Sequence, residues 1–390
     1  MTQPRPETGM GPLQAGGDVL PGGGRPAIRD RHELKTGARR LSRGVLVVIR
    51  LAGHVVFCLA ALLLAGLGSM ALGYQFGAVG GSVAIALLIA ATACALWLWF
   101  WRRRLAGAGV LALVFVALAV WWGSIAPSND RDWAADVARG VTATIDGDIL
   151  TLHNVRNFDW RTADDAVERW ETRTYRLSEL DSLDVFTSIW DSPAIAHTLV
   201  SFGFRDGRHL VFSAEIRRER GEEFSSIGGF FKQYEMVLIA ADERDIVRLR
   251  TNFRKEDVSL FPVDADERFR RALLLSYLDY GNALATRPAW YETIFSNCTT
   301  VVYRLARTLA PGAGLDWRIL FSGYLPDYLY DHGYITTSLP LAEVKKRARI
   351  SAVAQRTPDN DDFSAAIRSG PVATLRPSAA AAATGTVKQP

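Results

Sequence analysis

The chain has 390 residues, of which 49% are hydrophobic and 22% charged, and its net charge is +4. This length allows two or three domains, but residues 44–125 are almost free of acidic side chains and the basic excess surrounds this apolar block. Such a placement suits an anionic membrane surface and not a nucleic acid, which would require a basic stripe on the folded part, so we expect no nucleic-acid partner.

The first 43 residues are rich in glycine, proline and arginine. A segment of this composition buries too little apolar surface to fold alone. We therefore predict a disordered basic tail over residues 1–43.

Three stretches of roughly 20 residues without a charged side chain follow, and each is long enough to cross a membrane. They are residues 51–73, 79–100 and 105–125 within a membrane region of residues 44–125. Basic residues precede the first stretch, and Arg102–Arg104 separate the second from the third. Since basic loops stay in the cytoplasm, we predict a multi-pass inner-membrane protein with a cytoplasmic N-terminus and an extracytoplasmic C-terminal part. A cleaved signal peptide would be shorter, whereas one re-entrant span remains an alternative.

Residues 129–354 have the mixed pattern of an α+β domain with an antiparallel sheet. Around Asp206-Gly207, two β-rich runs over 198–205 and 208–217 predict a hairpin with a type I′ turn. Apolar spacing indicates helices over 267–284 and 301–309, and the Ala-rich residues 370–390 resemble a second disordered tail. Weaker patterns predict strands over 141–154, 234–241 and 245–252 and a short helix over 163–173.

The sequence has three cysteines, and only Cys298 lies outside the apolar block. Ser296 or Asn297 can cap the helix that follows, which places Cys298 in the first turn. Unpaired N–H groups and the helix dipole stabilise an anion there, so the thiol becomes a better nucleophile. A small buried cysteine that only packs the helix start is the alternative.

A nucleophilic thiol needs a base, and His197 at the start of the first hairpin strand is the best candidate. His209 lies beside the turn and is expected to be exposed. Glu215 is a candidate third group, although an ideal two-residue turn would place it across from Thr198 and on the face opposite His197. No pair of residues has metal-ligand spacing, and we expect no metal or cofactor.

Several sequence blocks stand in a fixed order along the chain: Ala196-His197-Thr198, 201–204, 213–222, 229–235, 242–245, 249–252, 296–300 and Gly323-Tyr324-Leu325-Pro326. Together they resemble the family of the N-terminal periplasmic domain of the Lnb lipoprotein N-acyltransferases. This resemblance covers residues 129–350 and implies a circularly permuted papain-like fold in which Cys298 and His197 are the catalytic pair and Asn297 belongs to an Asn-Cys motif.

The resemblance leads us to expect a thiol acyltransferase that takes an acyl chain from a membrane phospholipid through a Cys298 thioester. The acceptor would be an amine or alcohol, such as a lipoprotein. Two alternatives remain open: a cysteine hydrolase of the envelope (an amidase, peptidase or lipase) and a non-catalytic envelope scaffold. The sequence leaves the acyl donor, the acceptor and the oligomeric state undefined.

Overall fold

The computed structural model describes residues 29–309, 314, 316–358 and 362–376. The chain divides into two compact units, residues 1–64 and residues 65–390. Residues 1–28 of the predicted N-terminal tail and residues 377–390 of the predicted C-terminal tail lie outside the described residues.

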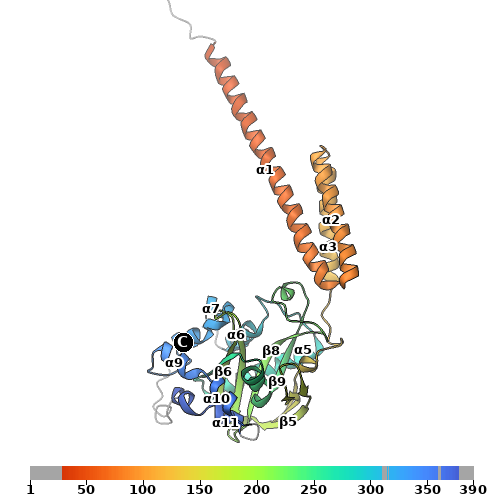
Figure 1. Ribbon diagram of the computed structural model, residues 1–390. Helices are drawn as coiled ribbons and strands as arrows, with labels where there is room; N and C mark the ends of the chain where they lie inside the picture. The colour runs from red at the N-terminus through yellow and green to blue at the C-terminus, as the bar shows by residue number, and fades with distance from the viewer. Residues whose placement is uncertain (1–28, 310–313, 315, 359–361, 377–390) are drawn as a thin grey trace, which may run out of the picture. The chain divides into compact units, whose positions relative to one another are not determined.

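Three helices, α1 (Arg29–Gln75), α2 (Ala78–Phe100) and α3 (Arg104–Ser124), begin the described chain (Figure 1). Each contains an apolar stretch long enough to cross a membrane, as predicted. Residues 29–43, which belong to the predicted N-terminal tail, form the first turns of α1. Helices α2 and α3 pack closely at Gly107, where a Cβ atom would lie 2.7 Å from the Ala95 carbonyl oxygen.

An eight-stranded sheet forms the centre of the following domain, in the order β1-β2-β9-β8-β7-β6-β10, with β5 also paired to β2. All pairs are antiparallel except β2 with β9, so the sheet is mixed and not purely antiparallel as expected. The strands are β1 (Thr142–Asp146), β2 (Ile149–Arg156), β5 (Trp170–Arg176), β6 (Leu180–Ile189), β7 (His197–Phe204), β8 (His209–Arg217), β9 (Glu235–Ala241) and β10 (Asp257–Pro262), and β3 (Asp159–Trp160) and β4 (Ala166–Val167) form a separate ribbon.

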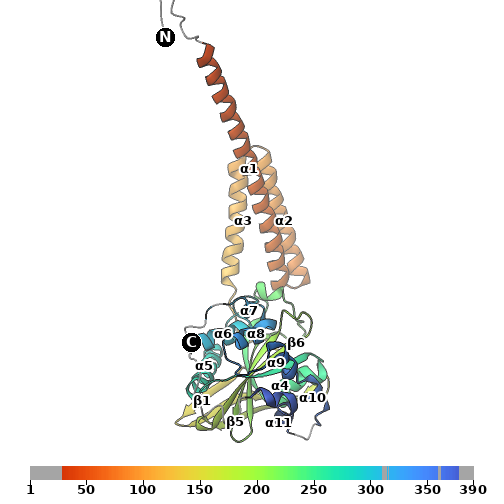
Figure 2. The ribbon, with the colours of Figure 1, turned by 90° about the vertical axis from the view of Figure 1, so that its left-hand side faces the viewer.

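Helices cover both faces of the sheet, and a hydrophobic core fills each interface (Figure 2). Helices α5, α6 and α8 contribute to one core, and α4, α10 and α11 contribute to the other. The helices are α4 (Glu243–Arg248), the π-helical turn η4 (Leu249–Phe253), α5 (Glu267–Thr286), α6 (Cys298–Leu309), α7 (Trp317–Leu320), α8 (Leu325–Asp331), α9 (Leu341–Ala348), α10 (Ser351–Arg356) and α11 (Phe363–Ile367), together with the short 3₁₀ turns η1 (Ala135–Val137), η2 (Leu177–Glu179), η3 (Gly228–Phe230), η5 (Ser322–Tyr324) and η6 (Gly370–Leu375).

The β7–β8 hairpin forms where predicted, but its turn differs from the type I′ turn expected. Gly203 pairs with His209, and the Phe204 N–H bonds to the Arg208 carbonyl. Three residues therefore connect the strands, and Gly207 alone in this loop has a positive φ, of 84°. The extra residue shifts the register by one position.

Two weaker secondary-structure predictions were wrong, and a third was correct except for a turn within the predicted strand. Residues 163–173 do not form a helix, because their second half pairs as β5 with β2. Residues 245–252 continue α4 and η4 instead of the sheet, since the Asp242 side chain accepts the Arg244 N–H as an N-cap. Residues 141–154 form two strands, β1 and β2, that turn at Gly147 with φ of 59°.

The folded domain extends beyond residue 354. Phe363, Ile367 and Leu375 are buried, so residues 370–376 are not part of a disordered tail. Arg368 holds this segment against the sheet through ion pairs of 2.7 Å to Asp184 and 2.6 Å to Glu243. The C-terminal segment is therefore part of the core.

Candidate active site

Cys298 is the first residue of α6, as the capping pattern predicted. The Asn297 side-chain oxygen accepts the N–H groups of Thr299 at 3.0 Å and Thr300 at 2.9 Å. The Asn297 amide also donates to the Thr293 carbonyl at 2.8 Å. Asn297 thus fixes the start of the helix, and the thiol lies at the positive end of the helix dipole.

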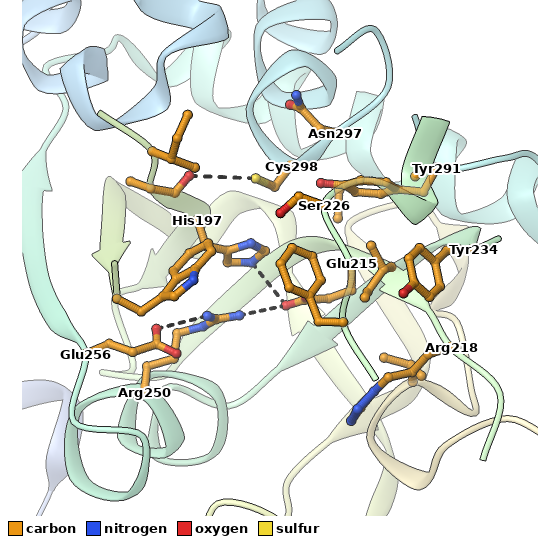
Figure 3. A pocket seen from close by; sticks show the side chains of 18 of the residues that line it. His197, Glu215, Arg218, Ser226, Tyr234, Arg250, Glu256, Tyr291, Asn297 and Cys298 are labelled. Atoms are coloured by element: carbon orange, nitrogen blue, oxygen red, sulfur yellow. Dashed lines mark hydrogen bonds and ion pairs between the residues drawn. The ribbon is translucent and has the colours of Figure 1, made fainter. Parts of the chain in front are cut away.

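His197 begins β7, next to the N-terminus of α6. The two elements are joined by a 2.9 Å hydrogen bond between the Thr198 and Thr299 hydroxyls. Figure 3 shows the imidazole of His197 between Cys298 and Glu215. The structure therefore brings together the two residues that the sequence singled out, and both are buried.

The backbone that precedes His197 is held by the turn at residues 322–323. The Ser322 hydroxyl accepts the Ala196 N–H at 2.8 Å and donates to the Ala196 carbonyl at 2.6 Å. A Cβ atom on Gly323 would lie 2.0 Å from the Pro193 carbonyl oxygen, so only glycine permits this approach. The contact fixes the entry into β7 and with it the position of His197.

Glu215 lies on the same side as His197, contrary to the two-residue-turn expectation. Continuing the observed β7–β8 register places Glu215 opposite His197, and its Oε1 lies 3.1 Å from His197 Nε2. The Ser213 hydroxyl lies 2.7 Å from the same nitrogen and donates to Glu215 Oε1 at 2.8 Å. The one-residue shift in the turn thus supplies the third group.

Two further charged residues extend this arrangement. Arg250, on η4, bonds to Glu215 at 3.0 Å and to Glu256 at 3.1 Å, and Glu256 accepts a hydrogen bond from the Ser188 hydroxyl. Sequence reasoning gave neither Arg250 nor Glu256 a role. Their only signal was the position of Arg250 within one of the blocks that carried the resemblance.

These contacts change the acidity of the three central groups. Burial and the charge of Arg250 lower the pKa of His197, but Glu215 and Cys298 oppose them, and the result is a pKa raised to about 9. Burial raises the pKa of Cys298, yet the charge of His197 and hydrogen bonds at the sulfur outweigh it and lower the pKa. The pKa of Glu215 is raised by burial but lies well below its usual value because of His197 and Arg250. Both shifts favour a thiolate–imidazolium pair over a neutral thiol and imidazole, beside an ionised carboxylate.

The ion pair predicts how reactivity depends on pH. Because the pKa of Cys298 is lowered, alkylation by iodoacetamide should remain fast below about pH 8.5, where an ordinary thiol is mostly protonated. Steps that need the protonated His197 should slow as the pH rises past about 9, its raised pKa. Alkylation rates between pH 5 and 10, normalised to free cysteine, check this. An alkylation rate that rises only above pH 8.5 would contradict the ion pair.

A cavity of about 520 Å³ opens beside Cys298, within the range of small-molecule sites. Figure 3 shows Tyr291, another residue of its wall, next to Cys298. Burial and the negative charges of Cys298 and Glu215 raise the pKa of Tyr291 well above its usual value, so its hydroxyl keeps its proton. A neutral hydroxyl at this position can donate to a developing oxyanion. The cavity wall also contains His197, Glu215, Asn297, Trp190, Ile195, Phe224, Leu320, Arg218 and Arg254.

The other histidines of the domain are not part of the cavity wall. His153 lies 3.3 Å from the Thr172 hydroxyl at the surface, and His332 packs on the ring of Tyr328. His209 was expected to be exposed, but it is largely buried, 3.9 Å from Glu243. Within the described residues no group of three or more His, Cys, Asp and Glu side chains is arranged to hold a metal ion.

Asn297→Ala should destabilise the start of α6 by about 1 kcal/mol, the usual effect of losing an N-cap. The unfolding temperature should fall. Cys298 alkylation at neutral pH should also slow, because a frayed first turn of α6 stabilises the thiolate less. Asn297→Ser is the matched control, since serine also caps helices. If the serine variant folds normally but its thiol becomes unreactive, Asn297 acts through more than capping.

Comparison with curated proteins and with solved structures finds no significant match for this chain. A comparison with protein families does find one, and it covers the hairpin, α6 and the turn at Gly323. Together with the membrane-spanning helices, this match indicates a membrane protein of the envelope with a periplasmic domain. Residues 166–323, the segment that contains Cys298, His197 and Glu215, match the family described as the Lnb N-terminal periplasmic domain.

Proposed function

We propose that this protein is a membrane-anchored cysteine acyltransferase that transfers an acyl chain from a phospholipid, through a thioester on Cys298, to an amine or alcohol acceptor such as a lipoprotein. The main support for the proposal is that Cys298, His197 and Glu215 lie next to one another in the wall of one cavity. A thiolate paired with an imidazolium is the reactive form of a cysteine nucleophile.

In the first half of the reaction, the Cys298 thiolate attacks the carbonyl carbon of the acyl ester. The negative charge moves to the carbonyl oxygen, towards which Tyr291 can donate its hydroxyl hydrogen. The carbon–oxygen ester bond then breaks, and the His197 imidazolium gives its proton to the leaving lysophospholipid oxygen. The products are a Cys298 thioester and a neutral imidazole.

In the second half, the neutral His197 takes a proton from the incoming amine or alcohol as that group attacks the thioester carbonyl. The carbon–sulfur bond breaks, and the thiolate returns beside the imidazolium. Glu215 stays ionised throughout, orients the ring and stabilises its charge, while Arg250 keeps Glu215 ionised. No oxidant, metal or nucleotide is needed for this cycle.

The anchoring supports a lipid donor over a soluble one. A domain that follows three membrane-spanning helices meets phospholipid at a far higher local concentration than any dissolved ester. We propose an inner-membrane location with the N-terminus and Arg102–Arg104 in the cytoplasm, following the basic residues, so that the domain meets the outer leaflet.

Transfer and hydrolysis can be separated with the full chain in nanodiscs that contain a phospholipid with an isotopically labelled acyl chain. A synthetic peptide with a free N-terminal diacylglyceryl-cysteine is the acceptor. We expect mass spectrometry to find the label on the peptide amine, and Cys298→Ala to abolish it. Label found only as free fatty acid would support the hydrolase alternative, and label retained in phospholipid with wild-type protein would support a scaffold.

A further inference from the structure

Several large apolar side chains that project into solvent line the cavity or lie within three residues of a residue that lines it. Trp190 and Phe224, which are 49% and 55% exposed, line the cavity from two different loops, and their rings meet edge to face at 6.4 Å. Phe295 is 76% exposed and lies two residues before the capping Asn297. We call this set the apolar rim: Trp190, Ile195, Phe224, Ile227, Phe230, Phe295, Trp317, Leu320 and Phe321.

The apolar rim is unusual because most of its exposed side chains are phenylalanine or tryptophan. A soluble domain rarely exposes so many large apolar groups around one opening unless something covers them. Trp317 and Phe321 are in ring contact with each other and flank Leu320, another cavity residue. The rim is therefore continuous with the wall of the candidate active site.

One rim segment is attached to the ends of the membrane-spanning helices, within the unit of residues 65–390. The Gln75 side chain, at the end of α1, donates to the carbonyls of Phe231 and Lys232, both at 2.8 Å. The Lys232 ammonium donates to the Trp122 carbonyl, near the end of α3, at 2.7 Å. Phe224, Ile227 and Phe230 lie within seven residues before Phe231, and the Ser225 hydroxyl lies 3.3 Å from the Tyr74 hydroxyl. This part of the rim therefore lies beside the ends of the spans.

We propose that the apolar rim inserts into the surface of the bilayer that the chain's own helices cross. Tryptophan and phenylalanine are favoured at the boundary between headgroups and acyl chains. The cavity then opens to the lipid phase, and a phospholipid acyl ester reaches Cys298 without passing through water. The entry route rests on the proposed function, whereas the insertion of the rim does not.

A second protein is the other occupant to consider, but the attachment to α1 and α3 favours lipid. The contacts of Gln75 and Lys232 place residues 224–232 beside the ends of α1 and α3. Burying a phenylalanine ring in lipid contributes roughly a factor of ten or more in partitioning. A protein partner would have to displace lipid from the same place.

Insertion is tested by spin labels on the full chain in nanodiscs of phosphatidylethanolamine and phosphatidylglycerol. The background is Cys58→Ala, Cys94→Ala and Cys298→Ala, which removes all three cysteines. Labels are attached at Phe230→Cys and Phe295→Cys, with Ile145→Cys as the matched control. Ile145 is also an exposed apolar residue, but it lies on the edge strand β1, which contributes nothing to the cavity wall.

Labels on the rim should collide more often with dissolved oxygen than with a water-soluble nickel chelate, and the label on Ile145→Cys should behave in the opposite way. Rim labels that are as accessible to the nickel chelate as the control would overturn the proposal, whether or not the protein is an enzyme. Rim labels that are shielded from both oxygen and the nickel chelate would also overturn it, because this is the result expected when protein and not lipid covers the rim.

The entry route is tested separately in protein with its cysteines intact. Phe230→Ser with Phe295→Ser should slow thioester formation from nanodisc phospholipid by about tenfold or more. Alkylation of Cys298 by iodoacetamide should be unchanged, which shows that the site is intact. Unchanged thioester formation would overturn the entry route, and absence of thioester in the wild-type protein would overturn the proposed function while leaving the insertion result valid.

Discussion

Replacing His197 with alanine is expected to reduce acyl transfer by about a thousandfold or more, since the variant loses both the proton carrier and the charge that holds the thiolate. The pKa of Cys298 should rise, because the positive charge of His197 is the main influence that lowers it against burial. Alkylation by iodoacetamide at pH 7 should fall in parallel. Both rates can be measured on the same preparation.

His153→Ala is the matched control for this experiment. His153 lies at the surface beside Thr172 and lines no part of the cavity, so its loss should leave both rates unchanged. If His197→Ala kept a reactive thiol at pH 7, the helix dipole alone would account for the low pKa, and His197 would not be its partner.

The second large effect is expected for Arg250→Met, on stability. Arg250 is buried between Glu215 and Glu256, and its loss takes the cation away from Glu256 and leaves Glu215 paired with His197. Removing one partner from a buried ion pair costs about 3–5 kcal/mol. The thermal unfolding temperature of the chain in nanodiscs should fall strongly, and acyl transfer should fall with it, because the pKa of Glu215 rises and its support for His197 weakens.

Two controls separate this network from a general effect of losing an arginine. Arg205→Met removes an exposed arginine 4.0 Å from Asp181, and such surface pairs contribute less than about 1 kcal/mol. Arg250→Lys keeps the positive charge but has a single ammonium group in place of the two guanidinium nitrogens that bond Glu215 and Glu256. It should therefore be more stable and more active than Arg250→Met. Equal unfolding temperatures for Arg250→Met and Arg205→Met would show that Arg250 does not stabilise the fold by neutralising buried carboxylates.

The sequence could predict the groups whose signals are local. The capping pattern before α6 located Cys298 and Asn297, and the β-rich run located His197 at the start of a strand. The three membrane-spanning helices were also predictable, since length and apolar composition suffice. The α+β class followed from the same patterns and is confirmed, with one parallel pair added.

Glu215 was uncertain for a precise reason. A type I′ turn and a three-residue loop both use Asp206-Gly207, but they differ by one residue in register and therefore place Glu215 on opposite faces. Local sequence does not decide between them. The structure does, with Gly207 alone at positive φ in the loop and Glu215 beside His197.

Arg250 and Glu256 could not be predicted, because their roles depend on long-range packing. Helix α10 holds the turn that contains Arg250 through two hydrogen bonds. The Gln355 side chain of α10 donates to the Thr251 carbonyl at 2.7 Å, and the Asn252 side chain of the turn donates to the Ala354 carbonyl of α10 at 3.2 Å. These C-terminal residues lie outside the segment 166–323 that matches the family. The C-terminal segment therefore supports the candidate active site from the opposite side of the sheet.

The central claim is that Cys298 carries an acyl group, and intact mass measures this most directly. The purified full chain and its Cys298→Ala variant are incubated with one defined diacyl phospholipid. We expect the wild-type mass to rise by one fatty-acyl group, hydroxylamine to remove the increment, and the variant to show none. Absence of the increment from the wild-type protein, or its presence on the Cys298→Ala variant, would contradict the account.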